Sequence, residues 1–166
     1  MNANTHILDA VKVAEELDDL AAKRGNAEAL RLLGTLWHRL DSTAPIALHL
    51  PNWAKGFTPL ELRALLMDEY DRRGELFTLP RRPEVLTVYR IGCTREQAAN
   101  GIGWHRLKRH AKATAARVGA TFLATALMNR ADYIALKCDR TKPLQLLTLT
   151  PPRVLEIEEI GGRRNA

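Results

Sequence analysis

The stretch that decides the fold is residues 79–90, Leu-Pro-Arg-Arg-Pro-Glu-Val-Leu-Thr-Val-Tyr-Arg. Pro80 and Pro83 interrupt regular structure at its start, because proline lacks the amide proton that helices and sheets need. Residues 85–90 then alternate and are rich in β-branched and aromatic side chains, which is typical of a strand. We therefore expect a boundary near residues 79–84, where the chain changes from helical to strand-rich.

The region before this boundary, residues 1–79, is predicted to be helical. Apolar residues recur at three- and four-residue steps over residues 5–24, and Gly25 ends that helix. A second helix is expected over 26–40, and the prolines of 42–57 indicate a loop. Thr58 and Glu61 form a capping-box pattern that begins a third helix, ending near residues 73–74.

The region after the boundary, residues 84–160, is predicted to mix strands with two helices. A capping-box pattern begins a short helix at Thr94, and a basic helix covers 105–118 before Gly119. Further strands are expected at 120–128, 132–138, 144–149 and 154–158. Their short separations favour an antiparallel meander. The predicted class is α+β: an N-terminal helical bundle packed on a small, mainly antiparallel sheet, with 161–166 as a tail.

Composition excludes several classes of protein. A hydrophobic content of 46% is too high for a disordered chain. The sequence contains no apolar run of the roughly 20 residues that a membrane span requires, and its N-terminus carries acidic residues where a signal peptide is basic. We therefore expect a cytoplasmic protein without membrane contact, in the host cell if a phage encodes it. Cys93 and Cys138 are expected to be reduced and largely buried thiols, and the histidine spacing predicts no metal site.

Positive charge is concentrated in the second half of the chain. Residues 1–84 hold 11 Lys/Arg against 13 Asp/Glu, and residues 85–166 hold 14 against 6, so the net charges are −2 and +8. This imbalance favours an anionic partner for the second half, either an acidic protein surface or nucleic acid. An ordinary solvated face is the alternative. The candidate binding residues are Arg106, Lys108, Arg109, Lys112, Arg117 and Arg130.

Two short strings in this half resemble a known family. They are Leu86-Thr87-Val88-Tyr89-Arg90 and Gly101-Ile102-Gly103-Trp104-His105, followed by a helix rich in alanine. Bacterial and phage relatives of the arginine–serine–glutamate ADP-ribosyltransferases have a strand ending in Tyr-Arg-Gly, then Gly-x-Ser-Trp-Thr, then such a helix. The resemblance covers about residues 84–160. It implies a split sheet with an NAD-binding cleft between its two small halves.

The resemblance also assigns candidate roles, and it reveals losses. Arg90 matches the arginine that holds the phosphate or ribose of NAD, and Trp104 matches the tryptophan. Gly103 and His105 stand where the family has Ser and Thr, so both hydroxyl groups are missing. Between Asp139 and Glu156 the chain has no acidic residue for the catalytic glutamate, and Gln145 is the nearest substitute. Glu156 and Glu158 form another Glu-x-Glu pattern, although the exposed face of an edge strand is the favoured explanation for them.

Three functions therefore compete. The first is a catalytically inactive relative that acts by binding and needs no cofactor, such as a phage or mobile-element inhibitor of a host machine. A defence complex such as a CRISPR effector is one possible target of this kind (an anti-CRISPR role). The second is an active mono-ADP-ribosyltransferase that uses NAD through Arg90 with Gln145 or the Glu156/Glu158 pair. The third is a nucleic-acid-binding protein that uses the basic helix at 105–117.

Overall fold

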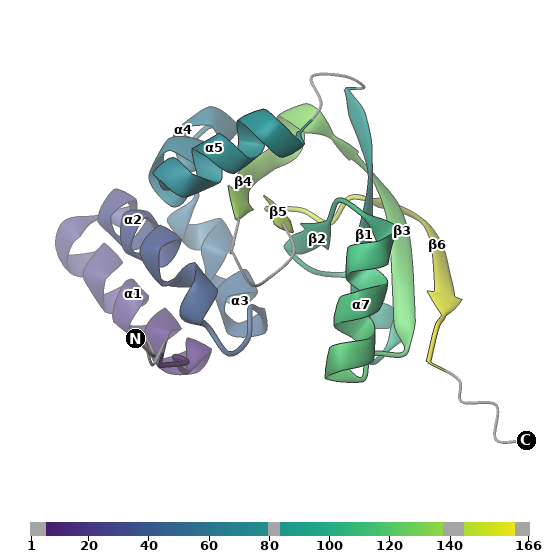
Figure 1. Ribbon diagram of the computed structural model, residues 1–166. Coiled ribbons are helices and arrows are strands. Elements are labelled where there is room, and N and C mark those ends of the chain that lie inside the picture. Colours follow the sequence, from purple (N-terminus) through teal and green to yellow (C-terminus); the bar gives the residue numbers. More distant parts are fainter. Residues whose placement is uncertain (1–5, 80–83, 138–144, 162–166) are drawn as a thin grey trace, which may run out of the picture.

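The computed structural model describes residues 6–79, 84–137 and 145–161. The first part is helical and contains α1 (Ala10–Arg24), α2 (Asn26–Leu36), the 3₁₀ turn η1 (Trp37–Arg39), α3 (Ala44–Trp53), α4 (Pro59–Leu66) and α5 (Glu69–Thr78). Gly25 ends α1 with φ of 95°, and the Thr58–Glu61 capping box begins α4, so these two predictions are confirmed. Figure 1 shows the helices gathered beside the sheet.

Two predictions in the helical part are wrong. Residues 42–57 are not a loop, because α3 lies within them. Pro45 occupies the first turn, where proline is tolerated, and Ile46, Leu50 and Trp53 form a buried stripe at helical spacing despite Pro51. The single helix expected after Thr58 is interrupted at Met67, where Asp68 begins α5 through a second capping box with Asp71.

The second part contains the strands. They are β1 (Val85–Gly92), β2 (Gly103–His105), β3 (Phe122–Asn129), β4 (Tyr133–Lys137), β5 (Gln145–Thr148) and β6 (Arg153–Glu159). The helices are α6 (Arg95–Ala99) and α7 (Lys108–Val118), and the 3₁₀ turn η2 covers Arg130–Asp132. The basic helix begins later than expected, because residues 103–105 pair with neighbouring strands as β2.

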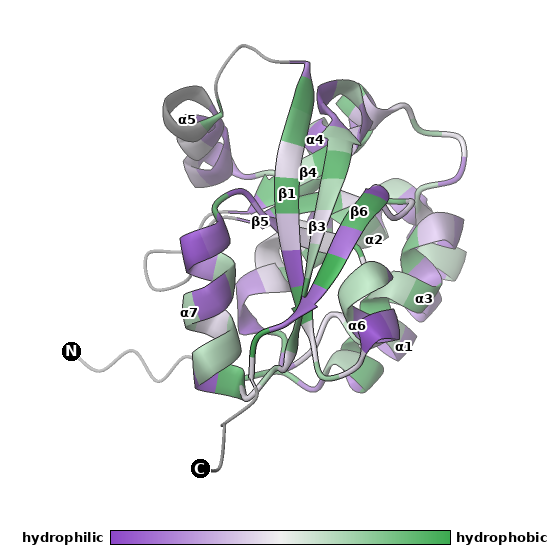
Figure 2. Ribbon diagram, turned by 90° about the vertical axis from the view of Figure 1, so that its right-hand side faces the viewer, coloured by the Kyte–Doolittle hydropathy of each residue, from purple (hydrophilic) through white to green (hydrophobic). Residues whose placement is uncertain are grey.

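All strand pairs are antiparallel, and the order is β4-β5-β2-β1-β3-β6. The α+β class is confirmed, but the meander is not, because β3 pairs with β1 and β6 rather than with β4. Figure 2 shows β1, β3 and β6 side by side, with α7 and α6 flanking them on opposite sides. Leu86, Val88 and Ala126 are fully buried in this half of the sheet.

The pairing between neighbouring strands is shortest at the centre of the sheet. β1 and β2 share one paired position, Tyr89 with His105, whereas β1 and β3 are paired along eight positions. The sheet therefore consists of two three-stranded halves, β4-β5-β2 and β1-β3-β6, joined by a short seam. α4 and α5 pack on β4 in the first half, and one hydrophobic core continues from Ala10 in α1 to Leu147 in β5.

Candidate functional site

Two cavities lie where the helical part meets the seam of the sheet. The first, which we call the His105 cavity, has a volume of about 180 Å³ and is lined by His105, Gln145 and Arg117 among others. The second, the Arg90 cavity, has a volume of about 440 Å³ and is lined by Arg90, Gln97 and Asn100 among others. Ser42 and Thr43, just before α3, line both cavities. We call the two cavities together the cleft, and the helical part therefore forms one of its walls.

Arg90 is held by the main chain beside it. Its Nε donates to the carbonyl oxygen of Gln97 at 3.0 Å, and its Nη1 donates to that of Gly103 at 2.7 Å. A Cβ added to Gly101 would lie 2.1 Å from the guanidinium carbon, so the glycine is needed for this close approach. Burial lowers the pKa of Arg90. The guanidinium ties α6 to β2, and within the described parts of the chain it forms no ion pair.

Gln145 lies next to Gly103 and His105 of β2, the two positions where the resemblance leads one to expect hydroxyl groups. It is paired with His105, and its Oε1 would be 3.6 Å from a Cβ built on Gly103. Gln145, Gly103 and His105, which are distant in sequence, are therefore brought together. Trp104 points elsewhere: it is fully buried, and its indole Nε1 donates to the carbonyl oxygen of Gly101 at 3.0 Å. Its role is in the core, so it is not available to contact a cofactor.

His105 is the most unusual side chain in the cleft. It is 5% exposed, and among the described residues its buried Nδ1 has no hydrogen-bond partner. Its pKa is lowered from 6.5 to about 4, first by burial and then by the positive charges of His110, Arg90 and Arg117. The imidazole is therefore neutral at physiological pH, and part of it lines the His105 cavity.

Glu156 and Glu158 lie far from this cleft. They are on β6, and the strands β3, β1 and β2 separate that strand from β5. Four strand spacings correspond to about 19 Å along the sheet. Glu158 instead forms an ion pair with Lys108 of α7 at 2.6 Å, which lowers the pKa of Glu158 and raises that of Lys108. Glu158 is thus a partner for α7, and neither glutamate lies beside Gln145.

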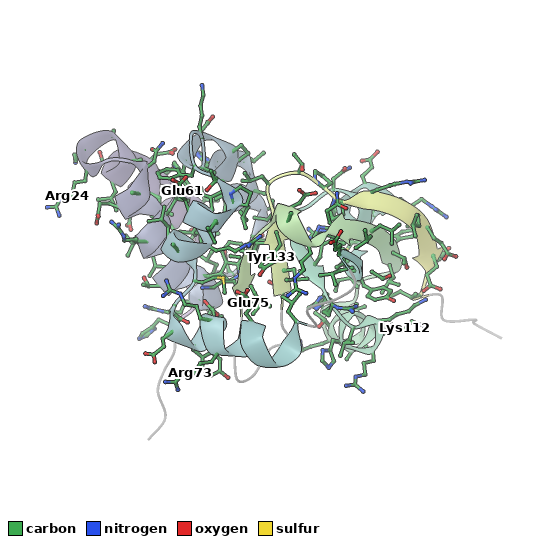
Figure 3. All side chains as sticks on the ribbon, turned by 90° about the horizontal axis from the view of Figure 1, so that it is seen from above. Arg24, Glu61, Arg73, Glu75, Lys112 and Tyr133 are labelled. Carbon is green, nitrogen blue, oxygen red and sulfur yellow. The ribbon has the colours of Figure 1, made fainter. Side chains whose placement is uncertain are left out.

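The six candidate basic residues do not form one surface. Arg106 donates to the carbonyl oxygen of Thr87 at 3.0 Å, and Lys108 is paired with Glu158. Arg130 is distant from α7, because the two lie at opposite ends of β3. The strand begins at Phe122, shortly after α7, and Arg130 follows its last residue, about 26 Å further along the strand. Arg109, Lys112 and Arg117 remain exposed on α7, and we call these three the α7 basic stripe. Figure 3 shows Lys112 on the side of the molecule away from the helical part.

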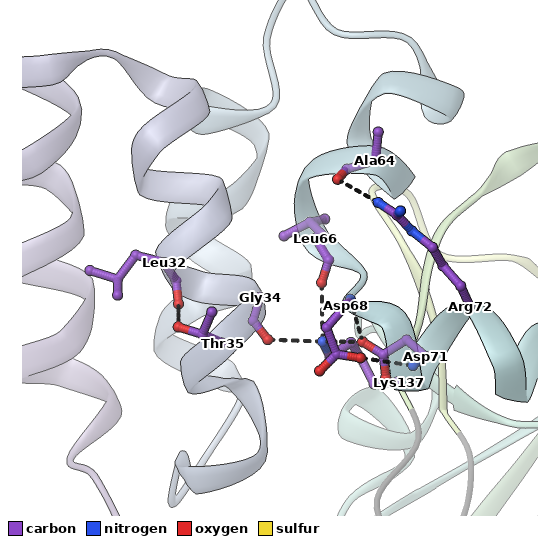
Figure 4. Close-up of polar contacts among 9 residues, drawn as sticks. All are labelled: Leu32, Gly34, Thr35, Ala64, Leu66, Asp68, Asp71, Arg72 and Lys137. Atoms are coloured by element: carbon purple, nitrogen blue, oxygen red, sulfur yellow. Dashed lines mark hydrogen bonds and ion pairs between the residues drawn. The ribbon is translucent and has the colours of Figure 1, made fainter.

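Two polar clusters between the helices and β4 were not predicted. Lys137 Nζ donates to Asp71 Oδ2 at 2.6 Å and to the carbonyl oxygens of Gly34 and Leu66, all in the protein interior (Figure 4). Tyr133 donates to Glu75 Oε1 at 2.7 Å, and both residues are labelled in Figure 3. The one feature of the sequence that pointed to the first cluster is a lysine at the end of the apolar strand 133–137. Its partners lie 66 to 103 residues away in the chain, so the sequence does not identify them.

Comparison with protein-family models, curated proteins and solved structures finds no match for this chain. Among the residues that the structure describes, no helix has the length and apolar character needed to cross a bilayer. The same residues contain no group of three or more His, Cys, Asp or Glu side chains arranged to hold a metal ion. What the site offers chemically is therefore a neutral amide, a neutral imidazole and nearby cations.

Proposed function

We propose that this chain acts by binding a macromolecular partner, on an ADP-ribosyltransferase-like scaffold that lacks the catalytic carboxylate. The observation that carries the proposal is the amide of Gln145 beside Gly103 and His105 at the start of β5. The transferase reaction develops positive charge on the ribose, and a carboxylate stabilises that charge. An amide has a similar shape but no charge, and losing one preorganised group of this kind costs about 3–4 kcal/mol of transition-state stabilisation.

The rest of the cleft supports the same proposal. Of the described residues that line the two cavities, Asp41 is the one carboxylate. Its Oδ1 accepts the amide proton of Ala10 at 2.9 Å, so Asp41 stabilises the start of α1. Arg90, which the resemblance assigns to the cofactor, is engaged by two main-chain carbonyls. The six strands form one sheet, and the cavities beside its short β1–β2 seam support the proposal because the resemblance implies a cleft there.

The partner that we propose is an acidic protein surface, contacted by the α7 basic stripe. Proteins that bind DNA tightly through its phosphates commonly neutralise about 6–10 phosphate charges, whereas the α7 basic stripe has three cations. Three contacts give a slope of about −2.7 for log affinity against log salt concentration, which is shallow for a dedicated DNA-binding protein. Because the resemblance is to phage and bacterial proteins, a host machine, including a CRISPR effector, is the first partner to test.

Catalysis is tested with labelled NAD and host lysate. Arg90→Ala is a poor probe because it removes two structural hydrogen bonds, whereas Gln145 is half-buried on β5 and is a cleaner choice. We expect no label transfer by the parent chain, and none by Gln145→Ala. Transfer by the parent that Gln145→Ala abolishes and the surface variant Arg109→Ala retains would establish the active-transferase alternative instead.

Binding is tested by capture on the immobilised chain. We expect retention of an acidic protein by the parent and its loss with Arg109→Gln/Lys112→Gln. The matched control, Lys23→Gln/Arg31→Gln, removes two exposed charges from α1 and α2 and should retain the partner. Capture that nuclease treatment abolishes would favour the nucleic-acid alternative. Equal capture by the parent and the α7 variant would contradict the proposed surface.

A further inference from the structure

The Arg90 cavity has the size of a small-molecule site. Its volume of about 440 Å³ lies within the range of about 300–1,000 Å³ that ligand pockets occupy. It lies between the start of α3, the last residues of β1 and the end of α7. The residues that line it fall within 42–47, 90–102 and 118–120, which are all well inside the described ranges. Its walls are therefore well defined.

One part of the cavity wall is aliphatic. Val118 is exposed at the end of α7, and Ala44 is exposed at the start of α3, so apolar side chains reach the rim as well as the interior. Such a wall favours a ligand with a hydrocarbon group, because each buried methylene increases affinity about fourfold. The apolar residues that line the cavity are Ala44, Ala47, Ile91, Ile102, Val118 and Ala120.

Arg90 is the single charged residue among the described residues that line this cavity. A guanidinium has five N–H donors, and the hydrogen bonds to Gln97 and Gly103 use Nε and Nη1, which leaves the donors of Nη2. The side chain is half-buried rather than sealed from the cavity. Its pKa is lowered because burial removes water from the guanidinium, and no carboxylate within the described parts of the chain offsets that loss.

We propose that the Arg90 cavity binds a small carboxylic acid with an apolar body. The carboxylate accepts a charge-assisted hydrogen bond from Nη2 of Arg90 and supplies the counter-ion that the guanidinium lacks. The apolar body lies against the aliphatic wall formed by α3 and α7. A phosphate fits less well, because it carries nearly two charges and would place additional charged oxygens against aliphatic side chains. The site is independent of the macromolecular partner proposed above.

The test follows methyl groups inside the cavity. The isoleucine δ1 carbons are labelled with ¹³C, and the signals of Ile91 and Ile102 are assigned as those lost in Ile91→Val and Ile102→Val. Ile134 of β4, which is not among the residues that line the cavity, is the internal control. Hexanoate, hexanamide, acetate, inorganic phosphate and NAD are each titrated at neutral pH and constant ionic strength.

The compounds separate the charge from the apolar body. We expect hexanoate to shift the Ile91 and Ile102 signals saturably and to leave the Ile134 signal in place. Hexanamide has the same alkyl chain without the charge, and it should bind about tenfold more weakly or worse, the value of one charge-assisted hydrogen bond. Acetate keeps the charge but lacks most of the chain. It should also bind about tenfold more weakly or worse, because it forfeits the buried methylenes.

Variants at two walls test where the ligand lies. Arg90→Gln removes the charge and should lower the affinity for hexanoate to that for hexanamide. Because Arg90 also ties α6 to β2, a second variant tests the site while keeping the arginine. Ala44→Leu fills part of the cavity from its rim and should weaken hexanoate about fivefold or more. Ala22→Leu, the same change at an exposed position of α1, should leave the affinity unchanged.

The proposal is overturned if hexanoate gives no saturable shift, or if hexanamide binds as tightly as hexanoate. Equal effects of Ala44→Leu and Ala22→Leu would also overturn it. Tighter binding of phosphate or NAD than of hexanoate would make the cavity a phosphate site instead. Partner capture depends on Arg109 and Lys112, and neither is among the residues that line this cavity, so failure of one proposal is distinguishable from failure of the other.

Discussion

Replacing Lys137 with methionine is the perturbation that best tests how the helical part is held on the sheet. The ammonium donates to Asp71 Oδ2 at 2.6 Å and to the carbonyl oxygens of Gly34 and Leu66 at 2.9 and 3.0 Å. Gly34 and Leu66 lie in the last turns of α2 and α4, whose carbonyls lack partners within the helix and attract positive charge. Lys137 therefore joins β4 to three helices at once.

The expected cost follows from the burial of this pair. The side chains of Lys137 and Asp71 are 2% and 0% exposed, so methionine would leave a carboxylate in the interior without its cation. Removing one partner of a buried ion pair typically costs about 3–5 kcal/mol of unfolding free energy. At about 2–4 °C per kcal/mol for a chain of this size, the melting temperature should fall by roughly 6–20 °C.

Urea unfolding followed by circular dichroism measures this cost. With a urea slope of about 2 kcal/mol/M, the midpoint for Lys137→Met should fall by about 1.5–2.5 M. Arg73→Met breaks an exposed pair with Glu69 and should change stability by less than about 0.5 kcal/mol. The double variant Lys137→Met/Asp71→Asn should lose less than the sum of its single changes. A cost below about 1 kcal/mol for Lys137→Met, or strict additivity, would refute this account.

Two further predictions concern proton binding. The pKa of His105 is about 4 in the folded chain against an ordinary 6.5, so its contribution to stability is complete above pH 6.5 and is lost as the pH falls toward 4. The loss amounts to about 3 kcal/mol of unfolding free energy. In urea unfolding at different pH values, His105→Gln should remove this dependence of stability on pH. Burial and the hydrogen bond to Glu75 raise the pKa of Tyr133 from 10 to about 12, so its contribution is complete below pH 10 and is lost as pH rises through 12. Tyrosinate absorbance should show a late-titrating group that Tyr133→Phe removes; its persistence in that variant would assign it elsewhere.

Local signals in the sequence determined the class of fold and many element ends. The alternation of residues 85–90, the capping box at Thr58 and the stop at Gly25 all act within a few residues, so they can be read without tertiary contacts. Local signals were misleading where the preference of a residue differs from what its tertiary contacts require. Pro51 suggested a loop, but the buried stripe of Ile46, Leu50 and Trp53 keeps α3 helical.

Tertiary structure decided the strand order and the make-up of the cleft. Antiparallel pairing of β2 with β5 sets His105 opposite Gln145, and no local preference specifies which of several similar strands becomes the neighbour. The Ser42–Thr43 wall and the Lys137–Asp71 pair likewise join residues from distant parts of the chain. Sequence alone established that no acidic residue lies between Asp139 and Glu156. Only the packing of helices against the sheet decided what surrounds that position, because burial and electrostatic fields depend on contacts across the whole chain.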